Sequence, residues 1–380
     1  MERQLERRRE AEPVQMSRII EDIRRGFYKE NEKAANLPHV IKYDSVPWLQ
    51  HAQAYQKFFT AHDRGEFMGG RMTRMPIRTF TVDEQILMSR GADGAKSGGH
   101  RHYVEAIFYI IEGQGYEIHD GVRYDWEAGD FMCVPTYCNH QHANVSGKEA
   151  RLFFSVTLHL GQFMGTSLIE QMGAHANYRA PDDAEILRGS RGEFLGYKGA
   201  DGLELKLGAD KEDEARMKER QARGFTEAPR TTYDRYLQTL AEQNRWRATV
   251  PHVIKGKEAQ WENTRMGRIK QYMSPYQPSP MLFYDAYIQE IPPGGRSGKH
   301  RHVAEEVHKI LSGRGYDIHD GKRYDWESED VVAIPVNTVH QHFNADPRRP
   351  AVFVALQSRL YYYAGHGGIE HFEDAPDWKP

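Results

Sequence analysis

Residues 113–127 read GQGYEIHDGVRYDWE, and residues 313–327 read GRGYDIHDGKRYDWE. The second stretch begins 200 residues after the first, and the same offset relates many positions around them. It aligns His100, His102, Pro135, His140, His142 and Asn144 with His300, His302, Pro335, His340, His342 and Asn344. Repetition of this extent indicates an internal duplication, so we expect two copies of one domain.

A second repeated motif, PHVIK, occurs at residues 38–42 and again at residues 251–255. Each copy follows a stretch of helical character, at residues 17–36 and 233–248. The predicted repeating unit is therefore a helix, a PHVIK segment and a β-rich core. In the charged connection between the units, residues 210–223 are expected to form a solvated helix. These limits give a helical arm over residues 1–37, a first core domain over 38–173, a connecting segment over 174–230 and a second core domain with its preceding helix over 231–380.

The predicted strands of each core are short and bounded by turn residues. In the first copy, residues 107–111 and 131–134 are apolar, and residues 152–160 form a longer apolar run that is expected to be one strand. Asp120-Gly121 predicts a two-residue hairpin turn. Several short strands at this spacing indicate an all-β core of sandwich or barrel type, and two copies indicate two barrels.

The composition disfavours several classes of protein. The chain has 380 residues, 39% of them hydrophobic, which suffices for two domains with their own cores. No apolar run approaches the roughly 18 residues of a membrane span, and residues 1–9 lack the apolar region of a secretory signal. Cys133 and Cys138 give no disulfide framework, and a net charge of -3 gives no footprint for nucleic acid. We therefore expect a cytoplasmic protein that binds neither membranes nor nucleic acids.

The placement of the histidines is the strongest functional signal. Alternate side chains of a strand point to opposite faces of a sheet, so His100 and His102 share one face and Arg101 points away. The same parity brings His140 and His142 together on a later strand. Two histidines from one strand and a third from another can hold one face of a metal ion, and neutral imidazole suits iron, nickel, copper and zinc. The pattern recurs in the second half, which makes a chance arrangement implausible.

These histidines and the glycines around them resemble the first cupin motif. In that motif an H-x-H pair lies between two glycines, with a glutamate after the second histidine. The second half matches in full, at Gly294, His300, His302, Glu306 and Gly313. The first half matches at Gly94, His100, His102 and Gly113, but it has Ala106 in place of the glutamate.

The second cupin motif is similar to a later stretch of each half. The first half offers Gly129, Pro135, His140 and Asn144, with Tyr137 at the second glycine position. The second half offers Pro335, His340 and Asn344, with Glu329 and Asn337 at the two glycine positions. The resemblance covers about residues 82–160 and 282–357. It implies two tandem cupin barrels, each a double-stranded β-helix of jelly-roll type, with flanking helices and a metal inside.

The pair of cupins is similar to gentisate 1,2-dioxygenase and related ring-cleaving dioxygenases. The resemblance implies Fe(II), with Mn(II) or Ni(II) as alternatives, held in the first cupin by His100, His102 and His140. Three histidines leave three positions of octahedral iron for a chelating hydroxy-acid and O₂. The second cupin has a fuller ligand set, comprising His300, His302, Glu306 and His340. That set also suits an oxalate-type Mn(II) reaction or a structural ion, so we expect ring cleavage in the first half.

Several other residues are candidates for the site. His142 and His342 lie two residues beyond a ligand, and each is either a catalytic acid–base group or a buried histidine bonded to a carbonyl. His308, where the first half has Phe108, is expected to face inward beside the ligands.

Several further residues of interest lie away from the predicted ligands in sequence. His119 and His319 adjoin the Asp-Gly turns and are expected to be exposed. Arg78 and Arg90 are both candidates to hold a substrate carboxylate. Cys133 and Cys138 are expected to be small core or rim residues, and the tyrosines at 361–363 are expected to serve packing or an interface rather than a pocket.

The leading hypothesis is an Fe(II)-dependent dioxygenase that inserts O₂ into a hydroxylated aromatic acid of the gentisate, salicylate or hydroxynaphthoate kind and cleaves its ring. Such an enzyme would serve the breakdown of aromatic compounds. The alternatives are a flavonol-type dioxygenase, an oxalate-type decarboxylase or oxidase using manganese, and a non-catalytic bicupin that binds a small molecule. Storage bicupins generally lose their ligands, so the six retained histidines favour an enzyme. We expect up to two divalent ions per chain, at least one of them iron, and a homo-oligomer, because the N-terminal arm is too charged to form its own core.

Overall fold

The computed structural model describes residues 36–50, 54–60, 75–87, 95–166, 169–171, 185–188, 194–198, 204–206, 229–363, 365 and 368–379. The N-terminal arm up to residue 35, the predicted helix over residues 210–223, Gly94 and Arg90 lie outside these residues.

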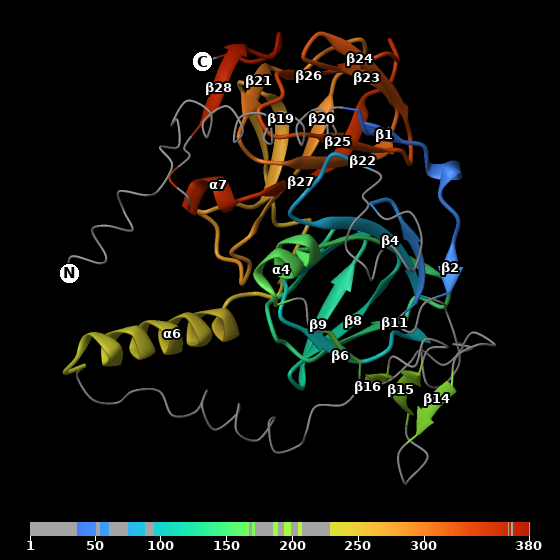
Figure 1. Ribbon diagram of the computed structural model, residues 1–380. Helices are drawn as coiled ribbons and strands as arrows, with labels where there is room; N and C mark the ends of the chain where they lie inside the picture. The colour runs from blue at the N-terminus through green and yellow to red at the C-terminus, as the bar shows by residue number, and fades with distance from the viewer. Residues whose placement is uncertain are drawn as a thin grey trace, which may run out of the picture.

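The first half forms a barrel of two facing antiparallel sheets (Figure 1). One sheet has the order β17 (Val253–Ile254), β10 (Phe131–Val134), β7 (Ala106–Glu112), β12 (Ala150–Val156), β4 (Thr81–Leu87), β3 (Tyr55–Phe58) and β2 (Leu49–Gln50). The other has the order β13 (Ile169–Gln171), β6 (His100–His102), β11 (His140–Asn144), β8 (Gln114–His119) and β9 (Val122–Glu127), with β5 (Ala95–Lys96) paired to β11. The predicted hairpin is confirmed, because Asp120 and Gly121 both have positive φ between β8 and β9.

The second half repeats this architecture. One sheet has the order β1 (Val40–Ile41), β25 (Val331–Ile334), β22 (Glu306–Ser312), β27 (Ala351–Ser358), β20 (Tyr284–Ile291), β19 (Gly267–Met273) and β18 (Trp261–Thr264). The other has the order β24 (Lys322–Glu327), β23 (Arg314–His319), β26 (His340–Asn344), β21 (Lys299–His302) and β28 (Ile369–Glu373). The two predicted barrels of an all-β fold are thus confirmed.

The remaining elements lie outside the barrels. They are the 3₁₀ turn η1 (Tyr43–Ser45), the helices α4 (Leu158–Met164), α6 (Thr232–Thr249) and α7 (Leu360–Tyr363), and a small sheet of β14 (Glu185–Arg188), β15 (Phe194–Lys198) and β16 (Glu204–Lys206). The α6 helix begins at a capping box of Thr231 and Asp234 and confirms the helix predicted over 233–248.

The strand predicted over 152–160 is wrong at its end, because β12 stops at Val156 and Leu158 begins α4. An apolar run alone does not distinguish a buried strand from a helix. Within the described part of the chain, no helix is long and apolar enough to cross a membrane.

The two PHVIK segments exchange places between the halves. β1, from the first copy, pairs with β25 of the second barrel, and Figure 1 shows it in blue beside the orange and red strands. β17, from the second copy, pairs with β10 of the first barrel. The predicted limits of 38–173 and 231–380 therefore cut across the sheets, because each barrel takes its edge strand from the other half of the chain.

The polar residues of each PHVIK segment also bind the opposite barrel. His252 Nδ1 lies 2.6 Å from His119 Nδ1, and its ring stacks on Tyr124. Lys255 Nζ bonds to Asp130 at 2.7 Å. In the second barrel, His39 lies 2.8 Å from His319 and stacks on Tyr324, and Lys42 bonds to Asp330 at 2.6 Å. The repeated motif is thus a docking segment.

This exchange overturns the prediction for His119 and His319. Both were expected to be exposed beside their turns, but each is only 2% exposed. Each lies on the inner face of its strand, where the burial alternates, and the exchanged histidine of the other half covers it.

Two buried glutamates join the barrels next to the H-x-H pairs. The Glu105 carboxylate accepts hydrogen bonds from the backbone N–H groups of Leu282 and Phe283. Its counterpart Glu305 accepts from the backbone N–H groups of Arg78 and Thr79. Each histidine-bearing segment is therefore anchored to the backbone of the other half. Burial raises the pKa of both glutamates, although these hydrogen bonds oppose the shift.

A buried ion network also crosses the interface between the halves. Lys309 is 0% exposed, and its Nζ lies 3.0 Å from Glu84 of the first half and 3.0 Å from Glu329. Arg151 of the first half contacts the same two carboxylates at 2.7 Å each. Glu329 occupies a glycine position of the cupin motif and has a φ of 78°. A left-handed non-glycine residue is strained, and here the strained residue supplies a carboxylate that the network needs.

Gly315 and Gly321 are required for different reasons: a side chain would clash at the first, and only the backbone conformation disfavours one at the second. A Cβ at Gly315 would lie 2.0 Å from Phe343 O and within 2.6 Å of the Trp326 ring, whereas a Cβ at Gly321 would have no atom within 4 Å. We predict that Gly315→Ala lowers the free energy of unfolding by about 3 kcal/mol or more, since backbone must move. Gly321→Ala, at a φ of 83°, should cost only about 1–2 kcal/mol. Urea unfolding followed by circular dichroism measures both, and equal losses would contradict this account.

The exchanged histidines predict a pH dependence of stability. Burial, followed by the neighbouring His319 and His119 respectively, lowers the pKa of His39 and of His252 to about 4, from 6.5. Between these values the unfolded chain takes up protons that the folded chain does not, so stability is full above pH 6.5 and falls as the pH drops towards 4. The double variant His39→Gln/His252→Gln should show a flatter decline of the urea midpoint over this range. A decline as steep as that of the wild type would show that other groups control it.

Candidate metal centres

Three buried histidines meet in the first barrel. β6 supplies His100 and His102, and β11 supplies His140, which pairs directly with His100 across the strands. One ring nitrogen from each lies within 4.8 Å of those of the other two, and all three side chains are buried. The structure thus brings together the three residues that strand parity and the resemblance to the cupin motifs predicted, and we call them the first triad.

Backbone carbonyls orient these rings. His100 Nδ1 lies 3.0 Å from Gly98 O, His102 Nδ1 lies 2.6 Å from Val104 O, and His140 Nδ1 lies 3.0 Å from Cys138 O. A carbonyl oxygen only accepts, so each Nδ1 carries the proton and each Nε2 keeps its lone pair. His140 Nε2 is buried and has no hydrogen-bond partner.

The electrostatics of the first triad favour a cation. Burial, reinforced by the neighbouring rings, lowers the pKa of His140 well below 6.5, and burial lowers that of His102 to about 4. These imidazoles are therefore neutral at pH 7 and can each donate a lone pair. A buried, unpartnered ring nitrogen among neutral imidazoles is what a divalent metal requires, so the residues fit a metal ion.

The second barrel repeats the triad with His300, His302 and His340, which we call the second triad. Here His302 and His340 donate from Nδ1 to Ala304 O and Thr338 O, at 2.9 and 2.8 Å. Glu306 adds a carboxylate, and its Oε2 lies 2.8 Å from His302 Nε2. The corresponding residue of β7 is Ala106, which is fully buried. The surroundings of the two triads therefore differ by one carboxylate.

His142, one of the two predicted catalytic candidates, is buried beside the first triad. Its ring centroid lies 5.5 Å from that of His140, and its Nδ1 lies 2.5 Å from Glu117 Oε2. Glu117 Oε1 lies 3.2 Å from His119 Nε2. Burial acts to raise the pKa of Glu117, but the charges and hydrogen bonds of His142 and His119 outweigh it and lower that pKa to about 2. Glu117 is therefore an ionised carboxylate held between two histidines.

Sequence reasoning missed Glu117 and its counterpart Asp317, although a signal was present. In β8 the residues at 115, 117 and 119 are buried and those between them are partly exposed. The parity that identified His140 and His142 therefore also places the carboxylate inside. Through His119 the chain of contacts continues to His252, whose Nε2 lies 2.9 Å from Arg247 O.

The other predicted candidates are placed as follows. His342 is fully buried near the second triad, and His308 faces inward as predicted, with its Nε2 3.1 Å from Glu306. Cys133 and Cys138 are buried free thiols, consistent with core residues. The backbone N–H of Arg78 donates a hydrogen bond to Glu305 of the other half. Tyr362 and Tyr363 are exposed.

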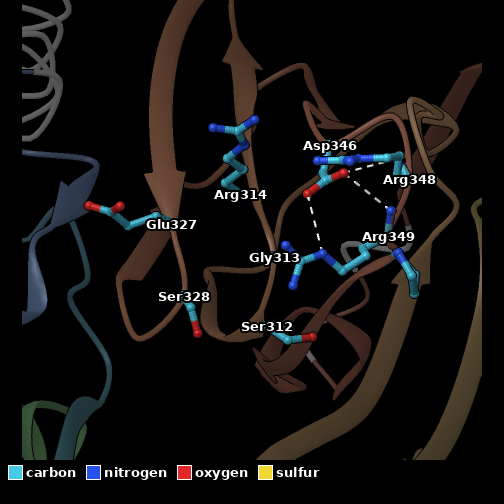
Figure 2. Close-up of a pocket in the computed structure, with 9 residues that line it drawn as sticks. Ser312, Gly313, Arg314, Glu327, Ser328, Asp346, Arg348 and Arg349 are labelled. Atoms are coloured by element: carbon cyan, nitrogen blue, oxygen red, sulfur yellow. Dashed lines mark hydrogen bonds and ion pairs between the residues drawn. The ribbon is translucent and has the colours of Figure 1, made fainter.

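A surface hollow of about 680 Å³ lies elsewhere on the second barrel (Figure 2). Arg314, Arg348 and Arg349 contribute to its wall, and Asp346 accepts hydrogen bonds from the backbone N–H groups of the last two. It adjoins Ser312 at the far end of β22 from Glu306, roughly 20 Å along the strand at about 3.3 Å per residue. It contains neither triad.

Comparison with known proteins agrees with this geometry. The family model described as Cupin domain matches residues 88–156 and again 287–356. Gentisate 1,2 dioxygenase 1 of Aquipseudomonas alcaligenes is 23% identical over 238 residues, which cover 62% of this chain but only 59% of that enzyme.

Two solved structures share the fold over most of the chain. Salicylate 1,2-dioxygenase of Pseudoaminobacter salicylatoxidans, with gentisate, is 14% identical, has a TM-score of 0.53, and the match covers 95% of this chain and 96% of that one. Oxalate decarboxylase of Bacillus subtilis is also 14% identical, has a TM-score of 0.54, and the match covers 84% and 76%. With two regions that match the cupin domain model, two barrels and a histidine triad in each, the chain has the fold of two cupin barrels in tandem.

Proposed function

We propose that this protein is an Fe(II)-dependent dioxygenase that inserts O₂ into a hydroxylated aromatic acid and cleaves its ring, with the chemistry in the first barrel. The observation that carries the proposal is the buried first triad, in which Ala106 stands where the second barrel has Glu306. Three neutral ligands leave more open positions, and more positive charge, than a set containing a carboxylate. Both properties suit an anionic chelating substrate.

Similarity to known enzymes supports the substrate class. The curated relative is a gentisate dioxygenase, and one structural neighbour is a salicylate dioxygenase with gentisate bound. Both substrates carry a hydroxyl group beside a carboxylate, as the open positions of the first triad require. A cytoplasmic location and a homo-oligomeric state remain predictions that accompany this function.

The buried residues of the first barrel have different proposed roles. His100, His102 and His140 would hold the metal, which supplies Lewis acidity and brings both reactants into contact when bound. Because Nδ1 of His142 is bonded to an ionised Glu117, the Nε2 atom of His142 is free to accept a proton from a substrate hydroxyl. Glu117 then stabilises the resulting imidazolium. Phe108, packed edge-on against His142 with centroids 4.5 Å apart, keeps this side of the site apolar.

A second candidate function places the chemistry in the second barrel. Glu306 Oε2 lies 2.8 Å from His302 Nε2, so a carboxylate adjoins the three histidines of the second triad. Such a set suits Mn(II) as well as iron and would favour an oxalate-type or flavonol-type reaction. The direct test of both proposals is metal analysis of the purified protein together with oxygen uptake on a panel of hydroxylated aromatic acids and oxalate.

Substitution at position 106 separates the two barrels. We predict that Ala106→Glu lowers oxygen-dependent turnover at least tenfold, because the new carboxylate competes for a position that the substrate needs. His100→Ala or His140→Ala should abolish turnover, and Glu306→Ala should cost less than either.

The matched control for Ala106→Glu is Ala106→Gln, which has the same size without the charge and should retain more activity. Initial rates of oxygen consumption at saturating iron measure all of these variants. A fully active Ala106→Glu enzyme together with an inactive Glu306→Ala enzyme would move catalysis to the second barrel.

Replacement of His142 tests its role as a proton acceptor. We predict that His142→Gln lowers kcat by about 10²-fold or more, the usual range for loss of a general base. The iron content of the first barrel should be unchanged, since His142 is not one of the three ligands. Parallel measurement of kcat and of iron per chain decides the matter. An unchanged kcat would make His142 a structural histidine.

A further inference from the structure

The second barrel contains another group of metal-ligating side chains. His308, Asp317 and His342 each offer a ligand atom, and these three atoms lie within 4.8 Å of one another. The side chains come from β22, β23 and β26 and are at most 1% exposed. None of them belongs to the second triad. We call this group the His–Asp–His cluster.

The hydrogen bonding of the cluster is incomplete. His342 is fully buried, and neither of its ring nitrogens has a hydrogen-bond partner. Its Nδ1 lies 2.9 Å from Asp317 Oδ2, so the two groups approach closely without forming a well-directed hydrogen bond. Leaving a buried polar group unsatisfied costs roughly 1–3 kcal/mol. Asp317 already accepts a hydrogen bond from Trp326 Nε1 at 2.8 Å and lies 3.3 Å from His319 Nε2, so the unsatisfied group is the His342 ring. A cation held between this ring and the carboxylate would satisfy it.

Glu306 lies between the cluster and the second triad. Its Oε2 is 2.8 Å from His302 Nε2, and its Oε1 is 3.1 Å from His308 Nε2. Both distances are those of hydrogen bonds, and they also match neighbouring ligands of one octahedral ion, which lie about 3 Å apart for metal–ligand bonds near 2.1 Å. A carboxylate that offers one oxygen to each group is placed to bridge two metal ions.

The side-chain types of the cluster also suit a divalent ion, because two imidazoles and a carboxylate offer ligand atoms to one small volume. Imidazole and carboxylate together are ligands for zinc, iron, manganese and cobalt.

The first barrel provides an internal comparison. Phe108 stands at the position of His308, and Ala106 at that of Glu306, so neither the second imidazole nor the bridge is present. The longer Glu117 replaces Asp317 and makes a direct hydrogen bond of 2.5 Å to His142. On the same scaffold, the first barrel joins its carboxylate to His142 by a hydrogen bond, whereas both ring nitrogens of His342 in the second barrel lack a hydrogen-bond partner.

We propose that the His–Asp–His cluster is an additional metal site, bridged to the second triad by Glu306. The second barrel would then bind two divalent ions and the whole chain three. This site is independent of the reaction proposed for the first barrel, since it depends only on residues of the second. It assigns His342 to metal binding rather than to acid–base catalysis.

The test is metal stoichiometry of the full-length protein, loaded with Co(II) alone, dialysed and analysed by mass spectrometry. We expect about three ions per chain in the wild type and one fewer in His308→Phe, which installs the residue of the first barrel. Asp317→Asn leaves Glu306 and the second triad untouched and should also lose one ion. The matched control Glu117→Gln, at the same position of the first barrel, should lose none.

Anomalous diffraction at the cobalt edge from wild-type crystals provides a measurement that needs no variant. A peak enclosed by His308, Asp317 and His342, separate from the peak at the second triad, is the expected result. The proposal fails if this peak is absent, or if the wild type holds two ions and both cluster variants hold the same two. If a variant does not fold, the wild-type map alone decides.

Discussion

The pairing of His100 with His140 across β6 and β11, repeated as His300 with His340, is the contact on which both candidate metal centres depend. It brings the two rings to centroid distances of 4.1 and 4.2 Å. Because side chains alternate along a strand, this one register also fixes which side of the barrel the third histidine faces. A slip of one residue would turn the ligands of one strand to the other face of the sheet. The tight turns and carbonyl contacts around these strands hold the register and the ring orientations.

The two halves keep this register but fill the space around it differently. Inward positions of β7 carry Ala106 and Phe108, whereas the same positions of β22 carry Glu306 and His308. The first centre is consequently neutral and apolar on that side, and the second is anionic and rich in ligands. The two halves therefore surround the same arrangement of histidines with different side chains. At the interface the halves diverge as well, since the buried Lys309 of one half replaces Tyr109 of the other.

Much of the fold and the meeting of the candidate ligands could be predicted from sequence, because both rest on local regularities. The 200-residue repeat indicated two barrels, and strand parity with the cupin motifs indicated the two triads. The exchange of β1 and β17 could not be predicted, since identical PHVIK segments contain no information about which half each will join. The burial of His119 and His319 was missed although strand parity places them on the same inner face as Glu117 and Asp317. The left-handed φ of Tyr137 and Asn337 at glycine positions is consistent with the turns that the motif implied.

The exchanged PHVIK strands make the two halves mutually dependent parts of one folding unit. If the chain were cut in the connecting segment, each fragment would carry an edge strand that belongs to the other barrel, and each barrel would expose an unpaired sheet edge. Neither fragment is a complete domain, so only the mixture of both could restore the two barrels. The architecture is that of a strand-exchanged dimer joined into a single polypeptide. A destabilising substitution in one PHVIK segment consequently affects the barrel that the other half of the sequence forms.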